Sequence, residues 1–216
     1  TCEDDVVKAG VRIGDPVIPL SEFAVLSDPK VYLAKAWDDR IGCALFVETI
    51  QRLTGVAHPN TVFGVGTTQE EVGLRGAKTS AYAVNPDVAI ILESDIAGDV
   101  PGIKPEESSV KMGKGPTLLV YDARMIPNLK LRDLVMSTAK ENGIPLQISI
   151  IERGATDGGM IHMHNAGVPT VVIAVPARHI HSHGGIIHRD DYDNALKLLV
   201  ALVQKLDSQT VASLTA

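Results

Sequence analysis

Residues 88–95 read VAIILESD, five apolar residues in a row followed by Glu93, Ser94 and Asp95. An unbroken apolar run of this length is typical of a β-strand covered on both faces, as in sheets that lie between two layers of helices. The polar residues follow where the run ends. The stretch therefore predicts a buried strand with hydrophilic side chains at its carboxyl end.

Strand-like and helical patterns alternate along most of the remaining chain. Apolar residues recur at helical spacing from Asp38 to Gly55, for example. Such alternation is typical of α/β proteins, so we expect a three-layer α/β/α sandwich with a mixed, mostly parallel sheet. The expected strands are 61–65, 88–92, 117–121, 146–151 and 170–175, and the further expected helices are 76–84, 128–140 and 191–206.

The first 34 residues differ from the rest in their sequence pattern. Short strands are expected at 17–20 and 31–34, each after a turn signal, and Gly10 suits the end of a short opening helix. We therefore divide the chain near residue 34, into a small β unit over 1–34 and an α/β domain over 35–216.

Composition excludes several classes of partner. The 216 residues carry a formal net charge of −6, which argues against binding nucleic acid or an anionic membrane surface. The longest apolar run, 168–177, contains two prolines and is too short to span a bilayer. Cys2 and Cys43 cannot build a disulfide framework, so we expect reduced thiols and a cytoplasmic protein.

Polar side chains gather where the expected strands end. Because ligands of open α/β sheets bind beyond the carboxyl ends of the strands, these side chains are expected to converge. Carboxylates mixed with imidazole suit zinc, cobalt or manganese. The residues concerned are Asp38 and Asp39 before the first long helix, Glu70 and Glu71, Glu93, Asp157, and the run 178–181 that contains His181.

Each of these residues also has a purely structural interpretation. Asp38 could cap its helix, and Glu70 with Glu71 could be a solvated surface pair. An unpaired Glu93 at the end of an apolar strand would be costly to bury, which weakens that interpretation there. Spacing alone does not select one ligand from the histidines at 179, 181, 183 and 188, and His58, His162 and His164 are interpreted as surface or packing residues.

Glu70 and Glu71 are adjacent, and we expect them on an extended segment. Successive side chains of such a segment point to opposite sides. One glutamate could then bind a metal while the other serves as a general base for a metal-bound water.

Several motifs together resemble the M42 family of dinuclear metallo-aminopeptidases. The stretch 35–42, KAWDDRIG, resembles the aspartate signature of that family, and 68–77, TQEEVGLRGA, resembles its Glu-Glu motif. The stretch 178–182, RHIHS, is a third specific element. Weaker similarities at 86–90, 97–102, 113–116 and 156–159 follow in the same order, so the resemblance covers essentially the whole chain.

The resemblance implies a zinc-peptidase-like fold, a peptide substrate and two divalent metal ions per complete subunit, zinc, cobalt or manganese. Asp38 would bridge the two metals, with a cis peptide bond to Asp39. Glu71 and His181 would complete one metal site, and Glu93, where the family has Asp, would bind the other. Glu70 would be the catalytic general base.

The resemblance also implies a missing part. The family has a further metal-binding His in a His-x-Asp element upstream of the aspartate signature, whereas residues 1–37 contain no His. We therefore expect the chain to be the C-terminal portion of a longer protein, with one metal site incomplete. Residues 1–34 would be the remnant of an inserted small β domain, 35–216 the C-terminal part of the catalytic domain, and the full-length protein a homo-oligomer.

Two other functions remain open from the sequence. The chain could be a non-catalytic metal-binding or assembly module that keeps the site for folding. It could also be a glycoside hydrolase, with Glu70 and Glu93 as the two carboxyl groups that flank the scissile bond.

Overall fold

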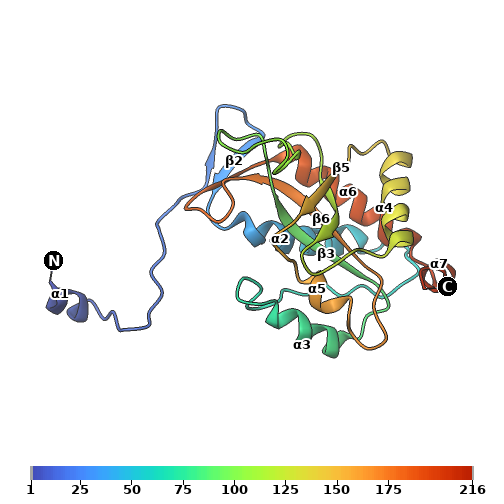
Figure 1. Ribbon diagram of the computed structural model, residues 1–216, viewed down its shortest axis with the longest axis horizontal. Coiled ribbons are helices and arrows are strands. Elements are labelled where there is room, and N and C mark those ends of the chain that lie inside the picture. The colour runs from blue at the N-terminus through green and yellow to red at the C-terminus, as the bar shows by residue number, and fades with distance from the viewer. Residues whose placement is uncertain (1, 216) are drawn as a thin grey trace.

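The computed structural model describes residues 2–215, so Thr1 and Ala216 lie outside the described part of the chain. It confirms an α/β fold in which a mixed sheet is covered by helices (Figure 1). The strands are β1 (Ala24–Val25), β2 (Val31–Ala34), β3 (Ala89–Ile96), β4 (Thr117–Asp122), β5 (Gln147–Ile151), β6 (Thr170–Arg178) and β7 (Gly185–His188). The helices are α1 (Glu3–Lys8), α2 (Trp37–Leu53), α3 (Arg75–Val84), α4 (Leu129–Glu141), α5 (Gly158–Ile161), α6 (Arg189–Lys205) and α7 (Ser208–Ser213).

Strand β6 is the centre of the sheet. It pairs along its whole length with β3, in parallel, while β4 and β7 share its other edge and run antiparallel to it. Strands β4 and β5 are parallel, and β7, β2 and β1 continue the sheet antiparallel. Among the described pairings antiparallel ones are therefore more numerous than expected. For β6 and β7 the reason is the short loop between them, which only an antiparallel partner allows.

Helices cover the two faces of the sheet unequally. The main hydrophobic core joins α2, α4 and α6 to one face of β6, with Leu45, Val135 and Leu198 fully buried. A smaller cluster lies on the opposite face, where Ile91 and Val172 pack near α5. This arrangement confirms the expected three layers and leaves the carboxyl ends of β3 and β6 close to the start of α2.

Two expected strands do not form. Residues 61–65 have no regular secondary structure, and no backbone–backbone hydrogen bond joins residues 57–67 to any other described residue. Residues 17–20 likewise have no strand partner within 2–215, and Val17 and Leu20 are almost fully exposed. In both cases the prediction was wrong because sequence patterns indicate strand propensity, whereas a strand also requires a paired neighbour.

The N-terminal region extends away from the sandwich. Figure 1 shows α1 at the far end of a long irregular arm that reaches the sheet only at β1 and β2. Apolar side chains of this arm, such as Ile13, face solvent. Within residues 2–215, no helix combines the length and the apolar character needed to cross a membrane.

Candidate metal centre

The start of α2 is distorted in a way that frees one carboxylate. Ala36 has a left-handed backbone, Asp38 and Asp39 have non-helical dihedral angles, and the peptide bond between the two aspartates is cis. Asp39 Oδ1 accepts a hydrogen bond from the Gly42 N–H at 3.0 Å. Asp39 therefore does the capping that was considered for Asp38, and the Asp38 side chain is left to face the rim of the sheet.

Two neighbouring contacts fix this turn against the sheet. A side chain at Gly42 would collide with Asp39 and with the carbonyl oxygen of Leu92, so glycine is required for α2 to approach β3. On the other side of the turn, the Trp37 indole N–H donates to the Gly185 carbonyl oxygen of β7 at 3.1 Å. Asp38 is thus positioned by both β3 and β7.

Glu70 and Glu71 lie in a turn, not on the expected extended segment. Gln69 and Leu74, on either side of the pair, have left-handed backbones, and the Glu70 carbonyl accepts hydrogen bonds from the Gly73 and Leu74 N–H groups. The argument from strand alternation was therefore wrong. The two side chains nevertheless have different surroundings, because Glu71 is exposed and Glu70 is partly buried.

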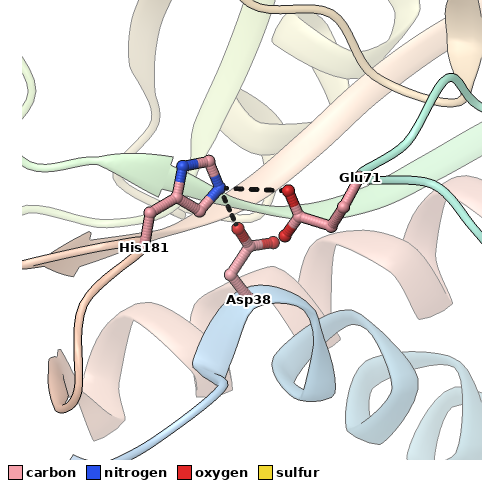
Figure 2. Close-up of side chains that lie close together, drawn as sticks. All are labelled: Asp38, Glu71 and His181. Atoms are coloured by element: carbon pink, nitrogen blue, oxygen red, sulfur yellow. Dashed lines mark ion pairs between the residues drawn. The ribbon is translucent and has the colours of Figure 1, made fainter. Parts of the chain in front are cut away.

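Asp38, Glu71 and His181 form an open group, which we call the outer group. His181 Nε2 lies 2.7 Å from Asp38 Oδ2 and 3.5 Å from Glu71 Oε2. Figure 2 shows the three side chains pointing toward one another from α2, the turn after 68 and the loop after β6. The side chain of His181 is 65% exposed and that of Asp38 only 16%, so the group opens toward solvent on the imidazole side.

His181 is thus distinguished from its neighbouring histidines by its contacts with Asp38 and Glu71. Both His179 and His181 have a left-handed backbone, with φ of 58°, in the loop that connects β6 to β7. A non-glycine residue in this region is uncommon, and such residues concentrate at functional sites. The strained loop directs this imidazole to Asp38.

A second group, which we call the inner group, consists of Asp38, Asp39 and Glu93. Their carboxylate oxygens lie within 4.8 Å of one another. Glu93 is only 9% exposed, and no described residue donates a hydrogen bond to it. The apolar run had indicated that Glu93 lies at the end of its strand. Strand β3 instead continues to Ile96, so the Glu93 carboxylate lies within the strand.

Burial and mutual repulsion raise the pKa values of these acids. Burial, and then the charges of Asp39 and Glu70, raise the pKa of Glu93 well above its usual range. Burial, opposed by the Gly42 N–H, raises the pKa of Asp39 to about 8. Burial and the charges of Asp157 and Glu71 raise the pKa of Glu70 to about 7.

Asp157 adds a further carboxylate beside the two groups. It begins α5, is almost completely buried, and accepts a hydrogen bond from the Thr67 hydroxyl at 2.5 Å. Its other oxygen, Oδ1, has no hydrogen-bond partner among the described residues. Asp157 therefore ties the segment before Glu70 to α5 while adding negative charge to the site.

The donor set fits a divalent cation. Six carboxyl groups share the rim, and the charge of His181 lowers the pKa values of Glu70 and Glu71 against the repulsion of the other carboxylates. Uncompensated buried carboxylates are costly unless they are protonated or bind a cation. The outer group offers two oxygens and one nitrogen, the mixture that zinc and similar ions accept, whereas the inner group offers oxygens alone.

Comparison with known proteins assigns the chain to a family. The sequence pattern of a family described as M42 glutamyl aminopeptidase matches residues 1–198. The chain belongs to the M42 family. The solved TET aminopeptidase from the marine sediment archaeon Thaumarchaeota archaeon SCGC AB-539-E09 superposes with a TM-score of 0.96 at 52% identity, over 99% of this chain and 60% of that one.

Two further M42 relatives show the same partial coverage. FrvX of Escherichia coli (strain K12) is 42% identical over 209 residues, which are 96% of this chain and 58% of FrvX. The TET1 peptidase of Pyrococcus horikoshii, which can assemble into a tetrahedron or a large octahedral shell, is 32% identical with a TM-score of 0.76, over 86% of this chain and 53% of that one. The M42 chain thus spans less than two thirds of the length of each relative.

In this M42 chain the structure brings together all five residues that the sequence had singled out as catalytic or metal-binding. Asp38, Glu71 and His181 share the outer group, and Glu93 joins Asp38 in the inner group. Glu70 interacts electrostatically with both groups. The charges of Glu71 and Asp38 raise the pKa of Glu70, and the charge of Glu70 raises the pKa of Glu93. The sequence had not given roles to Asp39 and Asp157, although both were noted at the expected rim.

Proposed function

We propose that this M42 chain carries the metal ligands and the general base of a metal-dependent aminopeptidase. One observation carries the proposal, namely that Asp38, Glu71 and His181 converge from three separate elements onto one point beside Glu70. An ordinary acidic surface would not require a loop with a strained backbone that directs a histidine toward two carboxylates.

The two groups would hold two ions that share Asp38. Asp38, Glu71 and His181 would bind the first, and Glu93 with Asp38 would bind the second, with zinc, cobalt or manganese as candidates. The inner group lacks an imidazole, which supports the expectation that its remaining ligand comes from sequence outside these 216 residues. This chain alone would then bind one ion well and the second poorly.

The residues of the chain would divide the chemistry between them. When bound, the divalent ions supply Lewis acidity that polarises a peptide carbonyl and acidifies water. Glu70 would accept the proton of the attacking water at its carboxylate and donate it to the leaving amine. A pKa of about 7 for Glu70 suits a group that must both accept and release a proton near neutral pH.

The charge of the rim supports a peptide substrate bound by its amino end. The carboxylates of Glu70, Glu71 and Asp157 create a negative potential in a partly buried cleft. Such a potential attracts the ammonium group of a peptide N-terminus and repels anionic ligands.

We further propose that residues 1–34 are the remnant of an inserted β domain and that 35–216 belong to the catalytic domain. The exposed apolar arm supports this division, because side chains such as Ile13 and Leu20 have no cover within residues 2–215. The assembly of the related TET1 peptidase supports a homo-oligomeric full-length protein.

The test is a calorimetric titration of this chain with zinc, together with an aminoacyl chromogenic substrate. We expect one tight site, a second site that is weaker by about 100-fold or more, and little turnover, because one coordinating side chain is missing. Two equally tight sites with rapid turnover would contradict the proposal that the inner group is incomplete.

A second experiment separates the peptidase from the non-catalytic and glycosidase alternatives. In the longer protein that contains this sequence, Glu70→Gln should lower kcat by about 100-fold or more with metal content unchanged, as expected for loss of a general base. Unchanged kcat would favour a non-catalytic site or a different base. Activity that chelators do not remove would favour a glycosidase.

A further inference from the structure

Two loops leave the sheet together at the carboxyl ends of the parallel strands β3 and β6. One loop, residues 97–116, follows β3, and the other, residues 179–184, follows β6 and carries His181. The Ala97 N–H donates a hydrogen bond to the Ala177 carbonyl oxygen at 3.0 Å, so the two chains are still joined where the loops begin. Any contact between the loops at this point bears on the position of His181.

The loop after β3 is fixed to the body of the protein at both ends. A side chain at Gly98 would collide with the backbone of Ser108, so the loop folds back closely on itself just after the strand. Near its other end, the buried carboxylate of Asp191 accepts hydrogen bonds from the Gly113 and Gly115 N–H groups, each at 2.6 Å. This loop can therefore serve as a fixed support for its neighbour.

The loop after β6 has few contacts of its own. Among the described residues, β6 and β7 pair at only two positions before the chain enters the loop. Inside the loop the Ser182 hydroxyl donates to the His179 carbonyl oxygen at 2.6 Å. The left-handed backbones of His179 and His181 require support, because such conformations persist only where the surroundings determine them.

The ion pair of Arg178 with Asp99 joins the two loops. Arg178 is the last residue of β6, and its Nε and Nη2 groups donate to the two oxygens of Asp99 at 3.1 and 2.6 Å. Hydrogen bonding to Arg178 holds the pKa of Asp99 below its ordinary value, against the effect of burial. A bidentate pair of this kind fixes an orientation as well as a distance.

We propose that Arg178 and Asp99 are positioning residues that hold the loop 179–184 so that His181 faces the two carboxylates of the outer group. Arg178 lies at the base of this loop, three residues before His181, and Asp99 belongs to the fixed loop after β3. The consequence for metal binding rests on the proposed function, whereas the fixing of the loop does not.

The exposure of the pair argues for positioning and against a large contribution to folding. The side chains of Arg178 and Asp99 are 31% and 21% exposed, and ion pairs that reach solvent add little to the free energy of unfolding. The groups that orient metal ligands, in contrast, change metal affinity by 10- to 100-fold when they are removed. Loss of the pair should therefore alter the loop and its ligand far more than the fold.

The first experiment measures the order of the loop in the metal-free chain. Amide ¹⁵N relaxation is recorded for residues 179–184 in the parent, in Arg178→Ala and in Asp99→Ala. We expect order parameters of about 0.85 in the parent and below about 0.6 in both variants, the values of rigid and flexible backbone. Urea titration of each variant shows whether the fold itself is retained.

The second experiment measures zinc affinity by calorimetry in the same chains and in the double variant. Each single substitution should weaken the tight site about tenfold, the lower end of the range for residues outside a ligand set. Because the two residues act as one unit, the double variant should also lose about tenfold, whereas independent residues would give about 100-fold.

A second ion pair provides the matched control. Glu141, at the end of α4, pairs with Lys205, at the end of α6, and these side chains are also partly exposed. Glu141→Ala removes this pair, so it should leave both the loop order and the zinc affinity at the parent values. Arg178→Lys keeps the charge but loses the planar fork, and should weaken zinc binding about threefold.

Each outcome supports or overturns the proposal. A loop loosened in both alanine variants but not in Glu141→Ala, with zinc affinity lowered alike in the single and double variants, supports it. A loop as rigid as in the parent, or zinc affinity equal to that of the parent, would overturn it. If the alanine variants do not fold, the same comparison is made with Arg178→Lys. A parent chain that binds no zinc would contradict the proposed function, and the relaxation data would then decide the positioning alone.

Discussion

The outer and inner groups share Asp38 but differ in nearly every physical respect. The outer group is open to solvent, comes from two loops and a helix start, and includes an imidazole. The inner group is embedded between β3 and the start of α2 and contains only carboxyl groups. The open group has a complete set of ligand types, whereas the buried group is rigid but carries uncompensated charge. The buried inner group therefore has the greater uncompensated charge, whereas the open outer group has the ligand types needed to bind a cation.

The largest expected effect follows from changing Asp38, the carboxylate that the two groups share. Asp38→Asn should lower the affinity of the tight zinc site that we propose for the outer group about 100-fold or more, because even residues outside a ligand set alter affinity by 10- to 100-fold. Calorimetry measures this directly. Asp87→Asn, an exposed carboxylate in neither group, should titrate like the parent. An Asp38→Asn chain that binds zinc normally would remove Asp38 from the site.

The next prediction separates the two groups. His181→Ala should abolish most of the remaining affinity for the first zinc ion, since the outer group would keep only two carboxylates. Glu93→Gln should change the same affinity by only about tenfold, the lower end of the range for a residue outside the ligand set. Equal losses in both variants would mean that the groups form a single site.

The stability of the metal-free chain should depend on pH through Asp39 of the inner group and through Glu70 beside it. Asp39 and Glu70 have pKa values of about 8 and about 7 in the folded chain, whereas such groups titrate near pH 4 in unfolded chains. Between about pH 4 and pH 8 the folded chain therefore holds more protons than the unfolded chain, and the free energy of unfolding falls as pH rises. Urea titrations in a chelator between pH 5 and pH 8 measure this decline.

The control for this pH dependence replaces the inner carboxyl groups. Asp39→Asn with Glu93→Gln keeps hydrogen-bonding shape but removes two of the raised pKa values, so the decline should become shallower. A metal-free chain whose stability rises over this range would contradict the electrostatic description of the inner group.

These contrasts also show what the sequence could predict. The periodicities of α2, α4 and α6 and the apolar runs of β3 to β6 arise from burial in a layered core, so their approximate bounds were predictable. Residues 61–65 have the same pattern without the partner, and no local signal reports a missing neighbour. Strand β7 and helix α5, with four residues each, are too short to give a period.

The site was predictable in its residue types but not in its division into groups. The choice of His181 among four nearby histidines depends on which imidazole the loop after β6 brings to Asp38 and Glu71, and the sequence does not encode that in a spacing. Asp38 and Asp39 are adjacent and chemically identical. Only the hydrogen bond from Gly42 shows that Asp39 caps the helix while Asp38 faces the outer group.

The smallest expected effect concerns the hydrogen bond between Thr67 and Asp157, which ties the segment before Glu70 to α5. Thr67→Val removes the hydroxyl that donates to Asp157, and should lower the free energy of unfolding by about 1 kcal/mol, because a buried carboxylate loses a partner. Urea titration measures the loss. Thr67→Ser, which keeps the hydroxyl, should lose less than half as much, and an equal loss would indicate that the methyl group matters instead.

The sequence contains one tryptophan, and it is the residue immediately before Asp38. Its indole is tied to Gly185 of β7 while its backbone enters the distorted start of α2. Any change in charge or position at the shared carboxylate therefore occurs next to the chain's only strong fluorophore. Its emission offers a label-free optical signal in which occupancy of the rim and unfolding of the sandwich can both be followed.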